Sequence, residues 1–126
     1  MEYQTLVEAV TSLKFIQDSR VAESMVKATL GILASRMEEP QARILADQLP
    51  EPLDYEKLRG HQARVSTTTV EQCYTEIGNQ FHLDRKQAQE IVDTLLHVLK
   101  RDMKDETLDA IEEGLPADWI EAIERA

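Results

Sequence analysis

Hydrophobic side chains recur at intervals of three and four residues along almost the whole chain, the spacing that places them on one face of an α-helix. Glycine and proline are scarce, with four of each, and no alternating strand pattern with turn signals occurs. The pattern therefore predicts an all-α domain. We expect a compact helical bundle of two tandem pseudo-symmetric three-helix units plus a short C-terminal helix.

The first half of the chain is expected to hold three helices. Their predicted extents are about 3–16, from Asp18 or Ser19 to about Met37, and from Pro40 to near Gln48. Asp18 or Ser19 can cap the second helix by accepting a bond from an unpaired backbone N–H group. Pro40 suits the first turn of the third helix, where its missing N–H has no partner to lose. Pro50 ends this helix because it moves the preceding residue out of the helical region.

The same scheme restarts after a connector that carries a short helix between Asp54 and the C-capping candidate Gly60. Two capping-box patterns follow, and each predicts a helix start. The expected second-half helices begin at Thr68 with Glu71, at Asp84 with Gln87, and at Asp105, and they end near Gln80, Asp102 and Gly114–Pro116. A short last helix over "ADWIEAIERA" closes the chain.

An internal repeat relates the two halves. Shifted by 66 positions, residues 15–53 align with residues 81–119 without a gap. Five identities within the long helix fall at spacings of four, four, three and four, which confines them to an arc of roughly 80° and predicts one buried stripe. The predicted repeat core is Ala22, Val26, Leu30, Leu33, Met37, Ala88, Val92, Leu96, Leu99 and Met103. The shift also matches Phe15 with Phe81, the caps Asp18 with Asp84, and the Leu-Pro stops at Pro50 with Pro116.

The repeat predicts how the chain is organised. Residues 1–126 are expected to form a single domain, with repeat one at about 3–53, a connector at about 54–66 and repeat two at about 67–119. A unit of three short helices leaves one apolar face exposed when it stands alone. We therefore expect the units to pack about a pseudo-two-fold axis, with the helices 22–37 and 88–103 at the centre.

The repeated segments resemble a bacterial family, the domain of unknown function 2267. The resemblance is carried by "AESMVKATLGILASRM" followed by "EEPQARILADQLPEPL", and by "AQEIVDTLLHVLKRDMKDETLDAIEEGLPADW" in the second half. It covers about residues 5–120, and its most specific element is the Leu-Pro exit after Gln48 and after Gly114. The resemblance implies a compact bacterial helical bundle, and it brings no activity and no catalytic residues.

The charge of the chain narrows its expected partners. The formal net charge is −10, and residues 102–124 hold nine acidic residues with Lys104 as the only base. Such a field repels phosphate, so we expect no nucleic-acid partner and no binding to anionic membranes. No apolar run reaches the roughly 20 residues of a membrane span. The acidic N-terminus is unlike a signal peptide, and we expect a cytoplasmic protein.

Candidate catalytic chemistry is sparse. His61, His82 and His97 do not pair with one another or with Cys73 at zinc-ligand spacing. The single cysteine excludes an intramolecular disulfide and has no evident base beside it. Neither a glycine-rich phosphate loop nor a Glu-x-x-His motif occurs. We therefore expect no metal, no cofactor and no enzymatic activity.

Two other features have alternative interpretations. The hydroxyl run "STTT" at 66–69 suits the start of a helix, and phosphate binding or phosphorylation is the alternative. Trp119 is expected to pack against the last helix, and a candidate interface anchor is the alternative.

Three functional hypotheses follow. The first is a non-enzymatic helical protein-interaction module that binds a protein partner or forms a homo-oligomer. The alternative is a small-molecule-binding regulatory domain with a pocket between the two repeats. The third, an enzyme, requires that His61, His82 and a carboxylate converge in one cleft.

Overall fold

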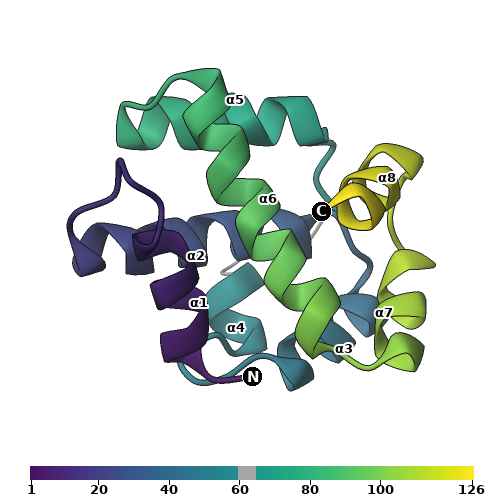
Figure 1. Ribbon diagram of the computed structural model, residues 1–126. Coiled ribbons are helices and arrows are strands. Elements are labelled where there is room, and N and C mark those ends of the chain that lie inside the picture. Colours follow the sequence, from purple (N-terminus) through teal and green to yellow (C-terminus); the bar gives the residue numbers. More distant parts are fainter. Residues whose placement is uncertain (60–64) are drawn as a thin grey trace.

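Figure 1 shows the computed structural model, which describes residues 1–59 and 65–126. Across these two ranges the chain forms eight α-helices and no strand, so the predicted all-α fold is confirmed. The helices are α1 (Tyr3–Thr11), α2 (Ser19–Ser35), α3 (Glu39–Gln48), α4 (Tyr55–Arg59), α5 (Val70–Phe81), α6 (Arg85–Asp102), α7 (Asp105–Glu112) and α8 (Ala117–Arg125). The predicted cap Gly60 and the candidate His61 lie outside the described residues.

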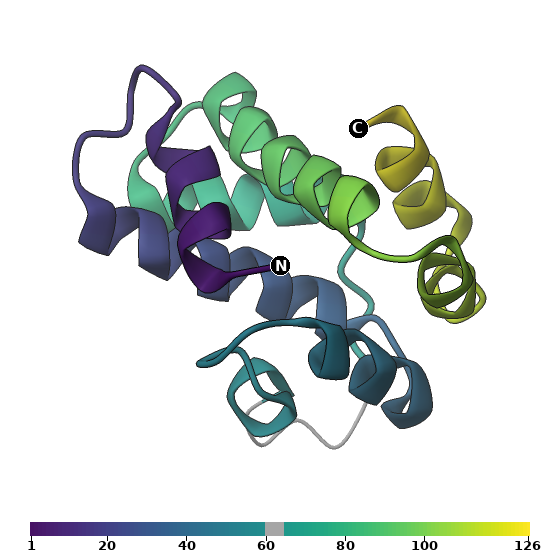
Figure 2. The same cartoon turned by 60° about the horizontal axis from the view of Figure 1, so that its bottom comes forward.

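The central helix of the bundle is α2. It contacts α1, α3, α4, α5 and α6. Figures 1 and 2 show α6 crossing one side of α2, while α4 lies on the other side. The two C-terminal helices also pack on the bundle: α7 lies beside α3, and α8 lies beside α6. Because α2 is surrounded by five other helices, most of its apolar side chains are buried.

The predicted repeat core lies inside the bundle. All ten of its members are buried: Ala22, Val26, Leu30, Leu33, Met37, Ala88, Val92, Leu96, Leu99 and Met103. The caps are also in place at the starts of the two long helices. Asp18 accepts a bond from the Arg20 N–H, and Asp84 accepts one from the Gln87 N–H, each at 2.8 Å.

Equivalent helices begin at the interval of the sequence repeat. The starts of α2 and α6 at Ser19 and Arg85, and those of α3 and α7 at Glu39 and Asp105, are each separated by 66 positions. Helix α1 contacts α6, and its counterpart α5 contacts α2. The pseudo-two-fold layout of the two units stays a prediction, which these separations and contacts favour.

Three helix starts or ends differ from the predicted ones. Helix α1 ends at Thr11 rather than near residue 16, because the hydroxyls of Thr11 and Ser12 bond to the carbonyls of Glu8 and Ala9 and satisfy its last turn. The capping box before α5 is Thr69 with Gln72, one residue later than predicted. Asp105 lies in the first turn of α7 and does not cap it; Lys104 is the N-cap residue.

The two Leu-Pro segments play different local roles. Leu49 is the extended C-cap residue of α3, as expected of a residue that precedes a proline such as Pro50. Pro116 follows the end of α7 by four positions and is the N-cap residue of α8. Its carbonyl accepts bonds from the N–H groups of Trp119 and Ile120, at 3.1 Å each.

Candidate anion-binding groove

A groove of about 500 Å³ runs between α2, α4, the segment 65–69 and α5. One face of α2 forms its floor, since the lining residues of that helix recur at helical spacing. The groove is lined by Lys27, Ala28, Gly31, Ile32 and Ser35 of α2, by Lys57, Leu58 and Arg59 of α4, by Ser66 and Thr68, and by Glu76 and Gln80 of α5. It therefore lies between segments of the first half and segments of the second.

Gly31 allows α4 to lie close against α2. A Cβ atom at this position would meet the backbone oxygen of Leu58 at 3.3 Å, tighter than an ordinary van der Waals contact. Because the obstacle is backbone rather than the end of a flexible side chain, only a glycine fits here without a shift. The close approach brings the cationic residues Lys57 and Arg59 of α4 to the edge of the floor.

The segment 65–69, here called the strap, is fixed at both ends. Ser66 donates its backbone N–H to the Ser35 carbonyl at 2.7 Å, and the hydroxyls of Ser35 and Ser66 lie 2.9 Å apart. Arg36 donates to the carbonyl of Ser66. At the other end, the Trp119 indole N–H donates to the Thr68 carbonyl at 3.1 Å. The strap thus joins the C-terminal end of α2 to α8 and closes one wall of the groove.

Arg59 is the least usual residue of the groove. Its side chain is buried, with 6% of the residue exposed. Its Nη1 atom donates to the carbonyl of Met37 at 2.8 Å and to that of Ala34 at 3.4 Å. Both carbonyls lie at the C-terminal end of α2, the negative end of the helix dipole. The Tyr55 ring lies 5.8 Å from the guanidinium carbon and adds a weak cation–π attraction.

No carboxylate of residues 1–59 or 65–126 compensates the charge of Arg59. Within the described residues it forms no salt bridge, and residues 60–64, "GHQAR", include no acid. Its Nε atom is buried without a hydrogen-bond partner among the described residues. An arginine is always protonated, and a charge held away from water requires a compensating partner. Carbonyl dipoles alone supply part of that compensation.

The groove as a whole is cationic in a strongly acidic chain. Its described lining residues include three basic side chains, Lys27, Lys57 and Arg59, and one acid, Glu76, while the chain has a net charge of −10. Lys57 lies 3.7 Å from the Asp54 carboxylate, but both side chains are largely exposed, so this pair is weak. The Thr68 hydroxyl adds a neutral donor. The Ser35 hydroxyl donates to the Ile32 carbonyl at 2.6 Å and lies 2.9 Å from the Ser66 hydroxyl, so this pair is engaged within the fold. Guanidinium, ammonium and hydroxyl donors together match the oxygen atoms of a phosphate or a carboxylate.

Of the residues singled out for catalysis, the structure describes Cys73, His82 and His97, while His61 lies outside the described residues. Cys73 is buried, and burial together with the nearby Glu76 carboxylate raises the pKa of its thiol to about 12. The thiol is therefore protonated at neutral pH and is a poor nucleophile. His82 is an exposed residue that ends α5 in the left-handed conformation, and His97 is exposed on α6. Within residues 1–59 and 65–126, no group of three or more His, Cys, Asp or Glu side chains is placed to hold a metal ion.

Trp119, the candidate interface anchor, is fully buried, with 0% of the residue exposed. Its ring packs within the hydrophobic core, and its indole N–H is used by the strap. A side chain in this position holds α8 on the bundle and is not presented to another molecule. The run 66–69 likewise serves the fold: Thr69 caps α5, and Ser66 binds α2.

A second hollow of about 430 Å³ lies beside α3, where Asp47, Glu51 and Asp54 approach Tyr55. The guanidinium of Arg43 already lies 4.1 Å from the centre of the Tyr55 ring. Because Arg43 already covers the Tyr55 ring, a cationic ligand could not use that ring. The main groove is therefore the stronger candidate for a binding site.

The model of a family described as "Uncharacterized conserved protein (DUF2267)" matches residues 3–122 of the chain. No curated protein and no solved structure matches the chain. Within the described residues, no helix combines the length and the apolar character needed to cross a membrane.

Proposed function

Because the chain belongs to the DUF2267 family of uncharacterized conserved proteins, we propose from its own geometry that it is a non-enzymatic binding domain whose groove holds a small anionic molecule. The observation that carries the proposal is the buried guanidinium of Arg59, which forms no salt bridge among the described residues and borders a groove with two further cations. An anion in the groove would supply the missing opposite charge.

The proposal extends to the remaining properties expected from the sequence. The two repeats would serve as a scaffold related by a pseudo-two-fold axis, with the groove between them. The protein would act in the cytoplasm and would not bind nucleic acid, because the acidic surface of α7 and α8 repels a polyanion. A small anion differs from a polyanion in that it meets only the local cationic groove.

Inorganic phosphate is the simplest test ligand for the groove. At about 50 mM salt, where screening is moderate, we expect phosphate to raise the thermal midpoint of the full chain, because a ligand that binds only the folded state stabilises it. Lys57→Gln should weaken binding about fivefold, corresponding to roughly 1 kcal/mol for an exposed charge. Titration calorimetry and thermal melts give both values.

Lys86→Gln is the matched control, since Lys86 is exposed on α6, outside the groove, and the change removes the same charge. It should leave the phosphate affinity within about twofold, a difference of roughly 0.4 kcal/mol. Equal weakening by both variants would show that net charge alone attracts phosphate and would contradict a site in the groove.

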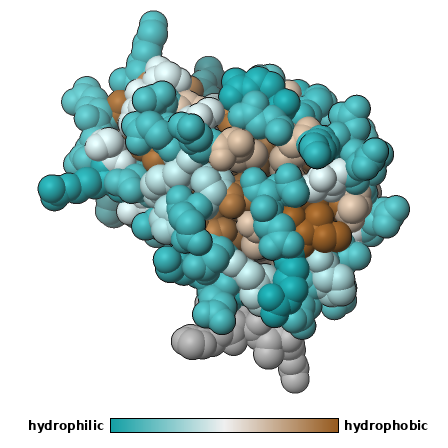
Figure 3. Space-filling model, turned by 90° about the horizontal axis from the view of Figure 1, so that it is seen from below, coloured by the Kyte–Doolittle hydropathy of each residue, from teal (hydrophilic) through white to brown (hydrophobic). Residues whose placement is uncertain are grey.

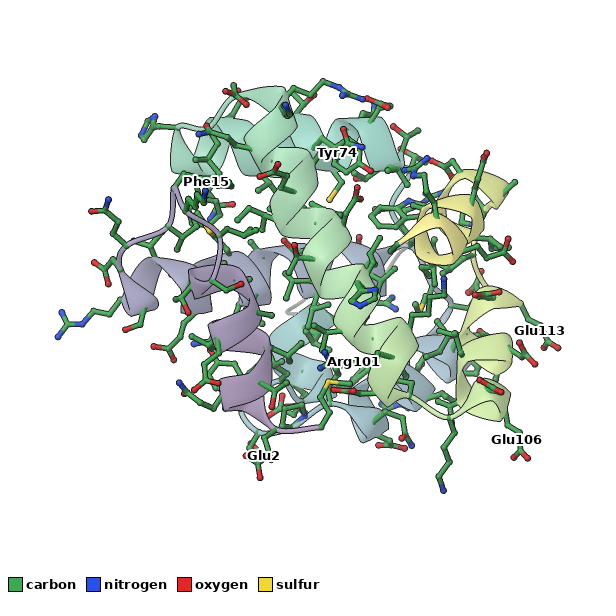
Figure 4. The ribbon with its side chains drawn as sticks, in the orientation of Figure 1. Glu2, Phe15, Tyr74, Arg101, Glu106 and Glu113 are labelled. Carbon is green, nitrogen blue, oxygen red and sulfur yellow. The ribbon has the colours of Figure 1, made fainter. Side chains whose placement is uncertain are left out.

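A second candidate function, self-association, is favoured by a different surface. An apolar groove of about 250 Å³ lies between the loop 12–18 with the start of α2 and the end of α5. It is lined by Phe15, Ile16, Gln17, Asp18, Val21, Met25, Phe81 and Leu83, here called the Phe15–Phe81 face. Val21, with 38% of the residue exposed to solvent, is the one large hydrophobic residue that is exposed within the described ranges. Phe15 lies in the loop between α1 and α2 (Figure 4).

Charge indicates that a second copy of this chain would bind there. Two copies of a chain with net charge −10 repel each other, and Glu106 and Glu113 project from the α7 side of the molecule, opposite Phe15 (Figure 4). Around the Phe15–Phe81 face, by contrast, bases outnumber acids among the exposed neighbours in sequence: Lys14, Arg20, Arg85 and Lys86 against Asp18 and Asp84. A two-fold contact through this face would bury apolar surface where the repulsion is weakest.

Val21→Asp is expected to abolish such a dimer, since it places a charge at the centre of the apolar contact. Light scattering after size-exclusion chromatography should give twice the chain mass for the native protein and the single mass for the variant. Ala117→Asp adds the same charge at an exposed position on α8 and should leave the dimer intact. A native protein that is monomeric at about 100 μM would end this second proposal.

A further inference from the structure

A smaller pocket of about 230 Å³ adjoins the cationic groove. Its lining residues are Lys27, Pro52, Leu53, Lys57 and Leu58. Lys27, Lys57 and Leu58 also line the groove, so the two hollows meet at these three residues. We call the smaller hollow the Leu53 pocket. Its lining is mainly apolar, because Leu53 and Leu58 are buried and the two lysines can contribute their methylene stems.

The paired hollows differ in chemistry. The groove gathers Arg59, two ammonium groups and a hydroxyl group, whereas the Leu53 pocket has proline and leucine walls. Lys27 and Lys57 stand at the junction, where an ammonium group can face the groove while its stem faces the pocket. Figure 3 shows the face on which α1, α3 and α4 lie, where hydrophobic side chains reach the surface between hydrophilic ones.

We propose that the ligand is an amphiphilic organic anion, with its phosphate or carboxylate head in the cationic groove and an apolar group in the Leu53 pocket. This inference rests on the proposed function and adds the chemical class of the ligand. The charged head meets Lys27, Lys57 and Arg59, and the apolar group is removed from water against Leu53 and Leu58. Neither hollow alone recognises both parts.

The size of the Leu53 pocket limits the apolar group. A dry apolar cavity of about 150 Å³ is sufficient to bind benzene, and this pocket measures about 230 Å³. A single aromatic ring or a short branched alkyl group therefore fits. A long acyl chain does not fit within that volume.

Three test ligands separate the contributions of head and apolar group. We would titrate the full chain with phenyl phosphate, inorganic phosphate and benzyl alcohol by calorimetry under one buffer condition. Phenyl phosphate is expected to bind about tenfold or more tightly than inorganic phosphate, because its ring leaves water. Benzyl alcohol, which has the ring without the charge, is expected to bind at least tenfold more weakly than phenyl phosphate.

Two variants assign the contributions to the two hollows. Lys57→Met removes the ammonium group and keeps an apolar stem, so it should weaken phenyl phosphate about fivefold and leave benzyl alcohol unchanged. Leu53→Val removes one methylene from the pocket wall and should weaken phenyl phosphate about two- to threefold with no effect on inorganic phosphate. Lys57 is exposed, so the first variant tests the proposal even if the second destabilises the fold.

The outcomes distinguish this inference from the function on which it rests. Equal affinity for phenyl phosphate and inorganic phosphate would overturn the amphiphilic ligand and leave the anion-binding function standing. If benzyl alcohol binds as tightly as phenyl phosphate, then the phosphate contributes nothing to binding. That result would overturn the claim that the groove binds the charged head. No binding of either phosphate would overturn the anion-binding function itself, and the inference with it.

Discussion

Trp119→Ala is expected to lower the free energy of unfolding by about 3–5 kcal/mol, the usual effect of truncating a large buried aromatic residue. Trp119 is fully buried, and its N–H holds the Thr68 carbonyl of the strap at 3.1 Å. The change leaves a cavity and an unpaired carbonyl together. Because domains are stable by only about 5–15 kcal/mol, urea unfolding followed by circular dichroism should show a large shift of the midpoint.

Ile120→Ala is the control for this prediction, since Ile120 is only half-buried on the same helix. It should lower the free energy of unfolding by no more than about half as much, because less apolar surface leaves the core. A change below about 1 kcal/mol for Trp119→Ala would mean that α8 contributes little to the fold, contrary to the burial of its ring.

Leu30→Ala and Leu96→Ala are each expected to lower the free energy of unfolding by about 2–5 kcal/mol. The two leucines are fully buried on α2 and α6, at positions related by the 66-residue repeat. If the halves share one core around these helices, then the two changes should have comparable effects. Urea denaturation of each variant provides the comparison.

Val21→Ala on α2 is the corresponding control, because Val21 is exposed and the change should alter the free energy of unfolding by no more than about 0.5 kcal/mol. A loss of several kcal/mol for Leu30→Ala beside a negligible loss for Leu96→Ala would contradict a shared core. It would show instead that only the first long helix is central.

The sequence predicted the long helices closely because local signals and periodicity agreed there. Helix α6 follows the cap Asp84 and ends at Asp102, as expected from the capping box and the apolar stripe. Where several hydroxyl residues stand together, the local signal was ambiguous. Thr68 and Thr69 both suit an N-cap, and the tertiary bonds of the strap, rather than sequence spacing, place Thr69 at the start of α5.

A pocket between the two repeats was one of the alternatives drawn from the sequence, but the residues that line the candidate groove were not predicted. Histidine, cysteine and acidic residues are the usual candidates for chemistry in a sequence, whereas the groove depends on Lys27 and Lys57, which lie 30 positions apart along the chain. Only the packing of α4 on α2 over Gly31 brings Lys27 and Lys57 together. One sequence signal existed: Tyr55 and Arg59 are four residues apart in the short helix, a spacing that lets an aromatic ring meet a guanidinium.

Trp119 illustrates the opposite limit. Its size and apolar surface suit both a core and an interface, so the sequence left the two roles open. The deciding factor is the contact of α8 with α5 and α6, which encloses the ring and provides the Thr68 carbonyl as a partner for its N–H group.

The most direct test of the account is a titration of the isotopically labelled chain with phenyl phosphate, followed by amide chemical shifts in NMR spectra. An anion held in the groove should shift the amide signals of Gly31, Ser35, Lys57 and Ser66 in a saturable manner. It should leave the signals of Phe15 and Phe81 unchanged. Shifts confined to the Phe15–Phe81 face, or no saturable shifts at all, would contradict the claim that this groove is the binding site.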